Sequence, residues 1–320
     1  MGKFNPRVYS RLGQSGSVFG MELIEQADKY PLKVLSADMS VVAGLDRFKK
    51  SYPNQFYNVG IAEQNLLGVS SGLASEGFTV VSVAQACFLS MRSFEQVRQY
   101  LGYMEYPVIC VGINSGFSLT FFGNTHYAVE DLALMRSVPG LTVLCPADGG
   151  SAVKAFAASL TAGKPTYIRL SGGLGVPVVY NEDFDFEIGK SICLRSGSEI
   201  TIFATGTMVY NSLKAAELLT SEGISATVID MHSIKPIDRN AVLESCGCKL
   251  LVSVEEHNVV GGLGSAISDV LSGVKSSPML LKLGVPDRFV PVGDYGYLLQ
   301  KTRLTPELIA KDIVSAFRKL

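Results

Sequence analysis

Short apolar runs alternate with helix-like patterns along almost the whole chain. In the first half, apolar runs rich in β-branched residues lie at 31–38, 78–84, 107–113, 141–145 and 165–170. Patterns typical of helices lie between them, at 61–75, 90–104, 129–136 and 149–162. Continuous apolar strands separated by helices are typical of a parallel sheet that is covered on both faces. The first half therefore predicts a three-layer α/β domain.

A stretch rich in glycine and acidic residues, 171–191, interrupts this rhythm. The next apolar runs lie at 199–205, 225–231, 249–257 and 278–285, and the next helical patterns at 207–222, 238–245, 262–272 and 305–317. The length of 320 residues also suits about two domains. We expect two successive three-layer α/β domains with mainly parallel sheets, at 1–180 and 193–320, joined by a linker at 181–192.

Composition narrows the classes of function. The net charge of −1 offers no electrostatic footprint for nucleic acid or for an anionic membrane. No apolar run approaches the ~20 residues of a membrane span, and the N-terminal residues lack the apolar core of a signal peptide. The six cysteines show no metal-site spacing. We expect a cytoplasmic protein with reduced thiols, with no metal ligands of its own, and with neither nucleic acid nor membrane as a partner.

Glu63 is an acid in an otherwise apolar helical pattern that follows Gly60. In the first turn of a helix a carboxylate gains ~0.3–1 kcal/mol from the macrodipole, which is enough to explain a charge that faces water. A buried carboxylate is costly unless it is paired. The alternative is therefore that Glu63 is kept for a partner that the chain does not contain.

Two further features suggest chemistry. Phe88, Met91 and Phe94 recur at every third position, which indicates either core packing or an aromatic-walled slot for a flat heterocycle. His126 ends a polar loop after an apolar strand, where α/β proteins place their ligands. It can either cap the following helix or move protons near neutral pH.

Four segments together resemble the C-terminal half of transketolase, a family that depends on thiamine diphosphate. They are FYNVGIAEQNLLGVSSGLASEG (56–77), FLSMRSFEQVR (88–98), GNTHYAVEDLALMRSVPGLTVLCPAD (123–148) and VIDMHSIKPID (228–238), in this order. The resemblance extends from about residue 20 to the end of the chain.

The resemblance implies roles for several residues. Glu63 corresponds to the family glutamate that hydrogen-bonds a pyrimidine nitrogen of the cofactor and so activates it, and His126 to the histidine that faces the reacting carbons. Phe88, Met91 and Phe94 correspond to the pyrimidine pocket, with Met91 where an aromatic or basic residue is more usual. Asp38 corresponds to an acid near the cofactor at the subunit interface, although it could instead cap a strand end.

One motif of the family is missing. Full-length transketolases hold the cofactor's diphosphate through a divalent metal bound by a GDG…N motif, and the ADGG at 147–150 lacks its first glycine and its downstream ligand. The chain therefore resembles the C-terminal subunit of a split transketolase. A separate N-terminal subunit would bind the diphosphate and Mg²⁺ or Ca²⁺, in an α2β2 heterotetramer.

The substrate side departs from the family pattern. Phe122 replaces an aspartate that contacts a donor hydroxyl, Asn114 a histidine, Val42 a serine, and Gly172 a phosphate-binding arginine, for which Arg169 could substitute in part. Neither glycine nor valine can supply the bidentate fork with which arginine binds phosphate. We expect a substrate without the usual terminal phosphate, such as pyruvate or another small 2-keto donor.

The function implied is transfer of a two-carbon ketol or acyl unit from a 2-keto donor to an acceptor carbonyl. The β subunit of a 2-oxoacid dehydrogenase shares the fold order and the cofactor glutamate, and a non-catalytic scaffold subunit is a third possibility. The acids and histidine at 255–257 and the glycines after them lack a full phosphate-loop fingerprint, which favours a structural role.

Overall fold

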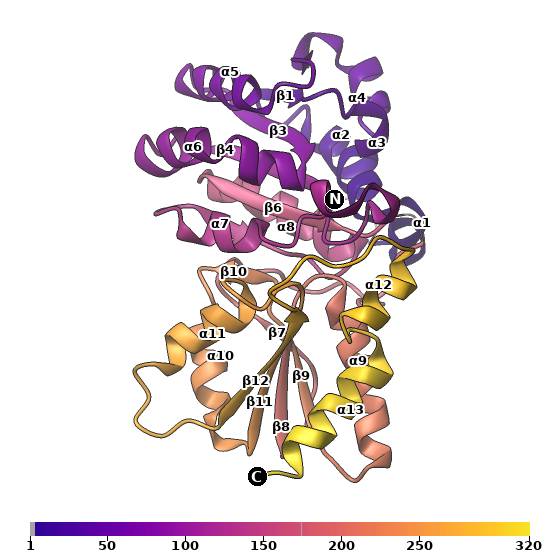
Figure 1. The fold of residues 1–320 in the computed structure, drawn as a ribbon. Coiled ribbons are helices and arrows are strands. Elements are labelled where there is room, and N and C mark those ends of the chain that lie inside the picture. Colours follow the sequence, from indigo (N-terminus) through magenta and orange to yellow (C-terminus); the bar gives the residue numbers. More distant parts are fainter. Residues whose placement is uncertain (1–3, 174) are drawn as a thin grey trace.

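Two sheets stacked end to end form the centre of the protein, and the expected α/β fold class is confirmed (Figure 1). The computed structural model describes residues 4–173 and 175–320. The first sheet has seven strands in the order β10-β5-β6-β4-β3-β1-β2, and the second has five in the order β12-β11-β8-β9-β7. All neighbouring strands run parallel except β10 beside β5 and β7 beside β9.

The strands are β1 (Leu32–Ser36), β2 (Phe56–Asn58), β3 (Thr79–Gln85), β4 (Val108–Ser115), β5 (Thr142–Leu144), β6 (Thr166–Ser171), β7 (Ile192–Arg195), β8 (Ile200–Ala204), β9 (Ala226–Asp230), β10 (Ser233–Lys235), β11 (Leu250–Asn258) and β12 (Met279–Val285). The α-helices are α1 (Pro6–Ser17), α2 (Leu23–Gln26), α3 (Ser40–Ala43), α4 (Asp46–Ser51), α5 (Glu63–Ser75), α6 (Phe94–Gln96), α7 (Asp131–Ser137), α8 (Gly149–Ala162), α9 (Met208–Ser221), α10 (Arg239–Glu244), α11 (Leu263–Leu271), α12 (Tyr295–Lys301) and α13 (Pro306–Phe317). In the described part of the chain, no helix is both long enough and apolar enough to cross a membrane.

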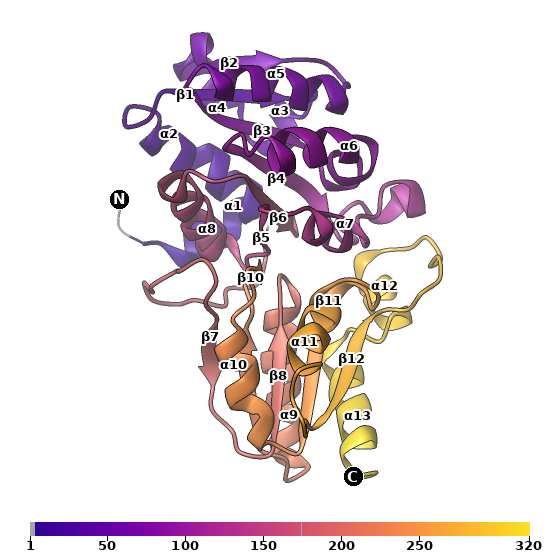
Figure 2. The same ribbon diagram turned by 90° about the vertical axis from the view of Figure 1, so that its left-hand side faces the viewer.

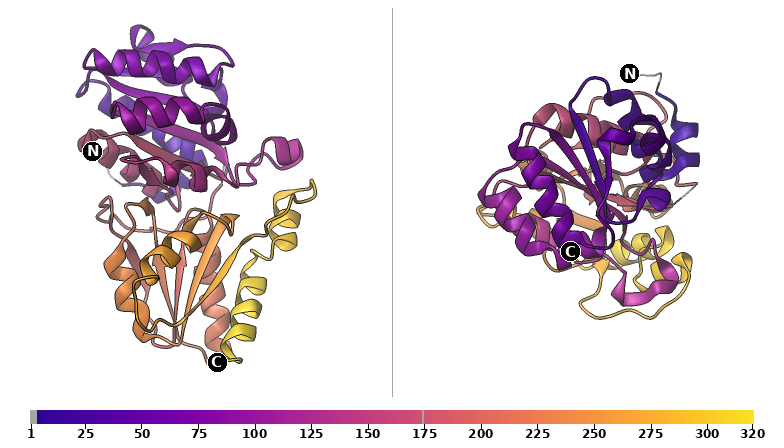
Figure 3. Two further views of the ribbon diagram at one scale, coloured as in Figure 1. Left: turned by 60° about the vertical axis from the view of Figure 1, so that its left-hand side comes forward. Right: turned by 90° about the horizontal axis from the view of Figure 1, so that it is seen from above.

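Most of the long strands are buried on both faces, as their continuous apolar sequences predict, whereas the edge strand β12 is partly exposed. Every residue of β6 is buried, and β3 and β4 are buried almost throughout. Helices α5, α6 and α7 cover one face of the first sheet, and α1 and α8 lie on the other (Figures 2 and 3). Such cover on both faces is what a parallel sheet requires.

Three short strands and one helical segment differ from the expectation. β2, β7 and β10 have only three or four residues and lie at sheet edges, so they lack a long apolar signature. β10 follows the predicted linker, yet it pairs with β5 of the first sheet. The helix expected at 90–104 is instead built from π-helical turns, Phe88–Arg92 and Val97–Tyr103, around the short α6.

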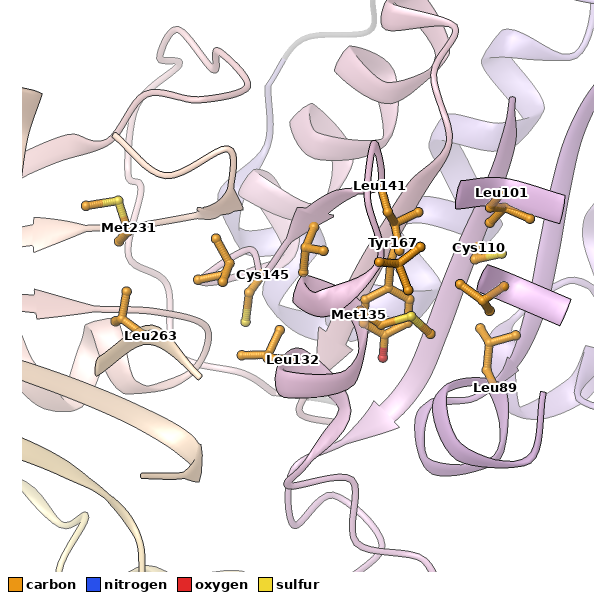
Figure 4. Packing of buried hydrophobic residues seen from close by; sticks show 14 of the residues in the cluster. Leu89, Leu101, Cys110, Leu132, Met135, Leu141, Cys145, Tyr167, Met231 and Leu263 are labelled. Carbon is orange, nitrogen blue, oxygen red and sulfur yellow. The ribbon is translucent and has the colours of Figure 1, made fainter. Parts of the chain in front are cut away.

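A single apolar cluster runs from one domain into the other. Tyr167 and Cys145 of the first domain and Met231 and Leu263 of the second belong to the same set of buried side chains. Figure 4 shows Met231 and Leu263 approaching Cys145 and Leu132 across the junction. The two domains therefore share a core, which is typical of a fixed arrangement rather than of loosely tethered domains.

Arg169 lies at this junction and is 1% exposed. Its Nε donates to Asp131 at 2.9 Å, and Nη2 donates to the carbonyl oxygens of Ala128 and Glu256 at 2.8 and 3.0 Å. Nη1 lies 3.3 Å from Ser171 Oγ. Burial opposes the charge, but the Asp131 carboxylate raises the pKa of Arg169 above its ordinary value. Arg169 is not free to substitute for the missing phosphate-binding arginine, because its donors are used inside the protein.

The acids at 255–257 have structural partners. Glu255 accepts from the backbone N–H groups of Leu263 and Gly264, at the start of α11. Glu256 accepts from Phe117 N at 2.6 Å, and this bond joins the two domains a second time. Within the second domain, Glu256 also accepts from the hydroxyl of Tyr295 at 2.5 Å. These bonds satisfy buried carboxylates that would otherwise be costly.

The segment between β6 and β7 is fastened to both domains. Asp148 Oδ2 accepts from the backbone N–H groups of Val179 and Tyr180, and the Tyr180 hydroxyl donates to Asp230 Oδ2 at 2.6 Å. Burial raises the pKa of Asp230 to about 7. Asp230 Oδ1 is buried with no hydrogen-bond partner among the described residues.

The Arg169→Met variant should lose about 3–5 kcal/mol of unfolding free energy, because it leaves Asp131 as an uncompensated buried charge. Arg318→Met removes a pair with Glu222 in which both side chains are exposed, and should lose less than about 1 kcal/mol. Urea unfolding of both variants measures the difference. Equal losses would contradict the role given to Arg169.

Asp230 should make the protein less stable as pH rises from about 4 to about 7. In that window the folded chain keeps a proton on Asp230 that the unfolded chain releases, so the unfolding free energy falls with increasing pH. Asp230→Asn should flatten this dependence in urea unfolding, whereas Asp185→Asn, an exposed change in the segment between β6 and β7, should leave it as it is. A profile unchanged by Asp230→Asn would refute the assignment.

Candidate functional site

The candidate residues gather where neighbouring parallel strands end. The carboxyl ends of β2, β1, β3 and β4 lie side by side in the first sheet. Glu63 follows β2, Asp38 follows β1, Phe88 follows β3, and Asn114 and His126 come at and after the end of β4. The chain proceeds outward in opposite directions from β1 and from β3, and this is where open α/β sheets form ligand crevices.

Asn58 shapes the turn that leads to Glu63. Its Oδ1 accepts from the backbone N–H groups of Asp38 and Gly60, at 3.0 and 3.1 Å, and its Nδ2 donates to Asp38 Oδ1. Both Asp38 and Gly60 have positive φ, at 59° and 74°, so their turns need this support. Asn58 was not predicted from the sequence, although an asparagine two residues before a glycine is a known turn signal.

Glu63 is buried and paired. Only 3% of its surface is exposed, and Arg92 Nη1 donates to Oε2 at 2.8 Å. The interpretation as a helix-start charge that faces water is therefore wrong. The alternative, that Glu63 is kept for a partner outside this chain, also changes, because Arg92 of the same chain already pairs with it. Arg92, whose side chain is 46% exposed, was not singled out from the sequence.

Aromatic rings connect this ion pair to His126. The Arg92 guanidinium carbon lies 4.3 Å from the ring centroid of Phe88, and the Phe88 ring meets His126 edge-on at 5.2 Å. Phe122 lies 4.9 Å from His126 on a tilted plane. Phe88 and Phe122 thus contact His126, and Arg92 links the Phe88 ring to Glu63.

Met91 and Phe94 do not join Phe88 in one wall. Met91 is 43% exposed, whereas Phe94 is partly buried against the core cluster that the domains share. The π-helical turn from Phe88 to Arg92 is wider than an α-turn, so a spacing of three no longer places side chains on one face. Core packing is therefore what the structure shows for Phe94.

Asn114 and His126 have different surroundings. Asn114 adopts φ 54° at the end of β4, and its Nδ2 is buried without a hydrogen-bond partner among the described residues. Buried amide donors are rarely left unpaired, so this group suits a ligand. His126 Nδ1 lies 2.9 Å from the hydroxyl oxygen of Thr125.

The second domain fixes the loop that carries His126. Asn124 Nδ2 donates to the carbonyl oxygen of Val290 at 2.8 Å, and Val290 N donates back to Asn124 Oδ1 at 3.3 Å. Phe121, Phe122 and Phe289 are exposed around this contact. His126 itself contacts the rings of Phe88 and Phe122, both from the first domain.

Two negative observations limit the chemistry of the described residues. Burial raises the pKa of Cys87, which precedes Phe88, to about 12, so its thiol stays protonated near neutral pH. Within residues 4–173 and 175–320, no group of three or more histidine, cysteine, aspartate or glutamate side chains is placed to hold a metal ion.

Comparisons with known proteins show which family this chain resembles. The family model of the transketolase pyrimidine-binding domain matches residues 15–175, and that of the transketolase C-terminal domain matches 189–309. The 6-deoxy-6-sulfo-D-fructose transketolase subunit SqwH of Clostridium sp. strain MSTE9 is 38% identical over 92% of this chain and 90% of its own length. A subunit of the apulose-4-phosphate transketolase of Phocaeicola vulgatus is 35% identical over 93% of this chain and 95% of its own length.

A solved structure is similar to this chain over almost its whole length. A split-gene transketolase, described as an inactive β4 tetramer, superposes with a TM-score of 0.86 at 37% identity and covers 95% of this chain and 98% of its own. Because the matches span both α/β domains, the chain belongs to the transketolase family.

Proposed function

We propose that this chain is the C-terminal subunit of a split, thiamine-diphosphate-dependent transketolase-like enzyme. It would transfer a two-carbon ketol or acyl unit from a 2-keto donor to an acceptor carbonyl. The observation that carries the proposal is the buried carboxylate of Glu63, which pairs with Arg92, together with the Phe88 ring that contacts both Arg92 and His126. The resemblance of the GIAEQ segment supports it independently.

The residues present fit the pyrimidine end of the cofactor. Glu63 offers a carboxylate oxygen in a desolvated position, where a hydrogen bond to a ring nitrogen is strong. Phe88 offers an aromatic face, on which a flat heterocycle stacks. Thiamine diphosphate would supply the electron sink for cleavage of a carbon–carbon bond. Glu63 would hold the ring nitrogen, and His126 would move the proton at the substrate oxygen.

A partner subunit would complete the site. We infer an N-terminal subunit that binds the diphosphate and Mg²⁺ or Ca²⁺, in an α2β2 heterotetramer, because the GDG…N motif is missing here. Val41 and Ile61, each 74% exposed, follow β1 and β2 at the edge where Glu63 lies, and Met91 lies beyond β3. Exposed apolar side chains gathered in this way are typical of interfaces. Asp38, at the same edge, would face the cofactor at the subunit interface.

The substrate would lack the usual terminal phosphate. Phe122 replaces a hydroxyl-binding acid, Asn114 replaces a histidine, and Arg169 is spent at the domain junction. Two of the relatives are named for anionic sugars, apulose 4-phosphate and 6-deoxy-6-sulfo-D-fructose. This chain instead places aromatic side chains around His126, which suits a small 2-keto donor such as pyruvate.

Glu63→Gln should lower kcat by about 10²–10⁴-fold, the usual contribution of a positioned acid–base group. The assay uses the complex that a tagged chain retrieves from its native cells, supplied with thiamine diphosphate, Mg²⁺ and 2-keto donors. Glu95→Gln, an exposed change in the neighbouring α6, should leave kcat unchanged.

Other outcomes would select other functions. Full activity of Glu63→Gln in the complex would support a scaffold subunit, and acyl transfer to lipoamide would support the β subunit of a 2-oxoacid dehydrogenase. Turnover of xylulose 5-phosphate with ribose 5-phosphate at ordinary transketolase rates would refute the proposal of a substrate without phosphate.

A further inference from the structure

Arg92 uses both of the surfaces that the proposed function assigns to the pyrimidine ring. Its Nη1 donates to Glu63 Oε2 at 2.8 Å, and its guanidinium carbon lies 4.3 Å from the centroid of the Phe88 ring. A flat heterocycle that hydrogen-bonds Glu63 and stacks on Phe88 would use the same carboxylate and the same ring. A guanidinium is planar, delocalised and rich in N–H donors, so it can make both contacts at once.

We propose that Arg92 is a resident placeholder for the cofactor's pyrimidine ring, held on Glu63 and Phe88 until the ring displaces it. The proposal rests on the proposed function of this site. It assigns Arg92 a role in cofactor entry, because the guanidinium lies over the Phe88 ring and must leave that ring before a heterocycle can stack there.

The two members of the ion pair differ in their freedom to move. Glu63 is 3% exposed and begins α5, so its carboxylate is fixed in the interior. The Arg92 side chain is 46% exposed and ends a π-helical turn. A long, half-exposed arginine can turn its head group into water at little cost, since its charge is then solvated. Arg92 is therefore the member that leaves.

The ion pair of Arg92 with Glu63 should also stabilise the chain when no cofactor is bound. A carboxylate as deeply buried as Glu63 is costly when it has no partner, and Arg92 supplies one. The pair should therefore stabilise the free chain while it opposes cofactor binding. Both effects follow from one contact, and each can be measured separately.

The first experiment measures the pair in the free chain. Urea unfolding is compared for the wild type, Arg92→Met, Glu63→Gln and the double variant, which together form a double-mutant cycle. Arg92→Met should lower the urea midpoint when Glu63 is present and change it little when residue 63 is glutamine. Equal shifts in the two backgrounds would show that the pair is not formed and would overturn the proposal.

The second experiment measures cofactor affinity by calorimetry, with thiamine diphosphate and Mg²⁺ titrated into the complex retrieved by the tagged chain. Arg92→Met should bind about tenfold more tightly than the wild type, which corresponds to removal of a competing contact of ordinary ion-pair strength. Arg92→Lys keeps the positive charge but not the planar group that covers Phe88, so its affinity should fall between those of the wild type and Arg92→Met. Arg98→Met, a matched change at an exposed arginine in the next turn, should have no effect.

The outcomes separate the two proposals. If the wild type binds thiamine diphosphate and Arg92→Met binds it equally or more weakly, Arg92 is not a placeholder, although the function stands. If the wild-type complex does not bind thiamine diphosphate at all, the proposed function fails and the placeholder role fails with it. In that case the unfolding cycle still reports whether Arg92 and Glu63 are paired.

Discussion

Arg169 is a cation buried at the junction of the two domains, and it is tolerated there because all three guanidinium nitrogens have acceptors. Those acceptors come from the start of α7 and the loop before it, from β6 and from β11. The loop that carries His126 leads directly into α7, so this charge helps to set its position, together with the contact of Asn124 with Val290.

The site itself follows from the direction of the strands. Because β2, β1, β3 and β4 are parallel neighbours, residues that follow them arrive at one edge although they are far apart in the chain. Glu63 and His126 lie on segments that follow neighbouring strands of the sheet, and Phe88 contacts both His126 and the Arg92 that pairs with Glu63. The second domain contributes by holding Asn124 at Val290. The first sheet and the second domain therefore both help to position Glu63, Phe88 and His126.

Much of this could be predicted from the sequence. The long strands and helices are marked by continuous apolar runs, and α8 was expected at the residues where it lies, 149–162. The edge strands β7 and β10 escaped prediction because three or four residues carry too little pattern. The π-helical turns were not predicted because the number of residues per turn differs from that of an α-helix.

The ion pairs of the site could not be predicted. Glu63 and Arg92 are 29 residues apart, and Arg169 and Asp131 are 38 apart, so no local pattern connects them. Arg169 seemed available to a substrate only because the sequence does not show which arginines are enclosed. Tertiary contact decides the role of a charged residue, whereas local pattern decides only the element on which it lies.

Strand β10 makes the two domains inseparable in a way that their sequence boundaries do not suggest. After β9 of the second sheet the chain crosses over, pairs with β5 of the first sheet, and then returns to α10. Lys235, at the end of β10, donates to the carbonyl oxygens of Arg136 and Val138 in the first domain. A gene divided within the linker would expose the edge of β5 and remove these bonds. The two sheets therefore form one module, and a cut at the linker would leave two incomplete halves rather than two domains.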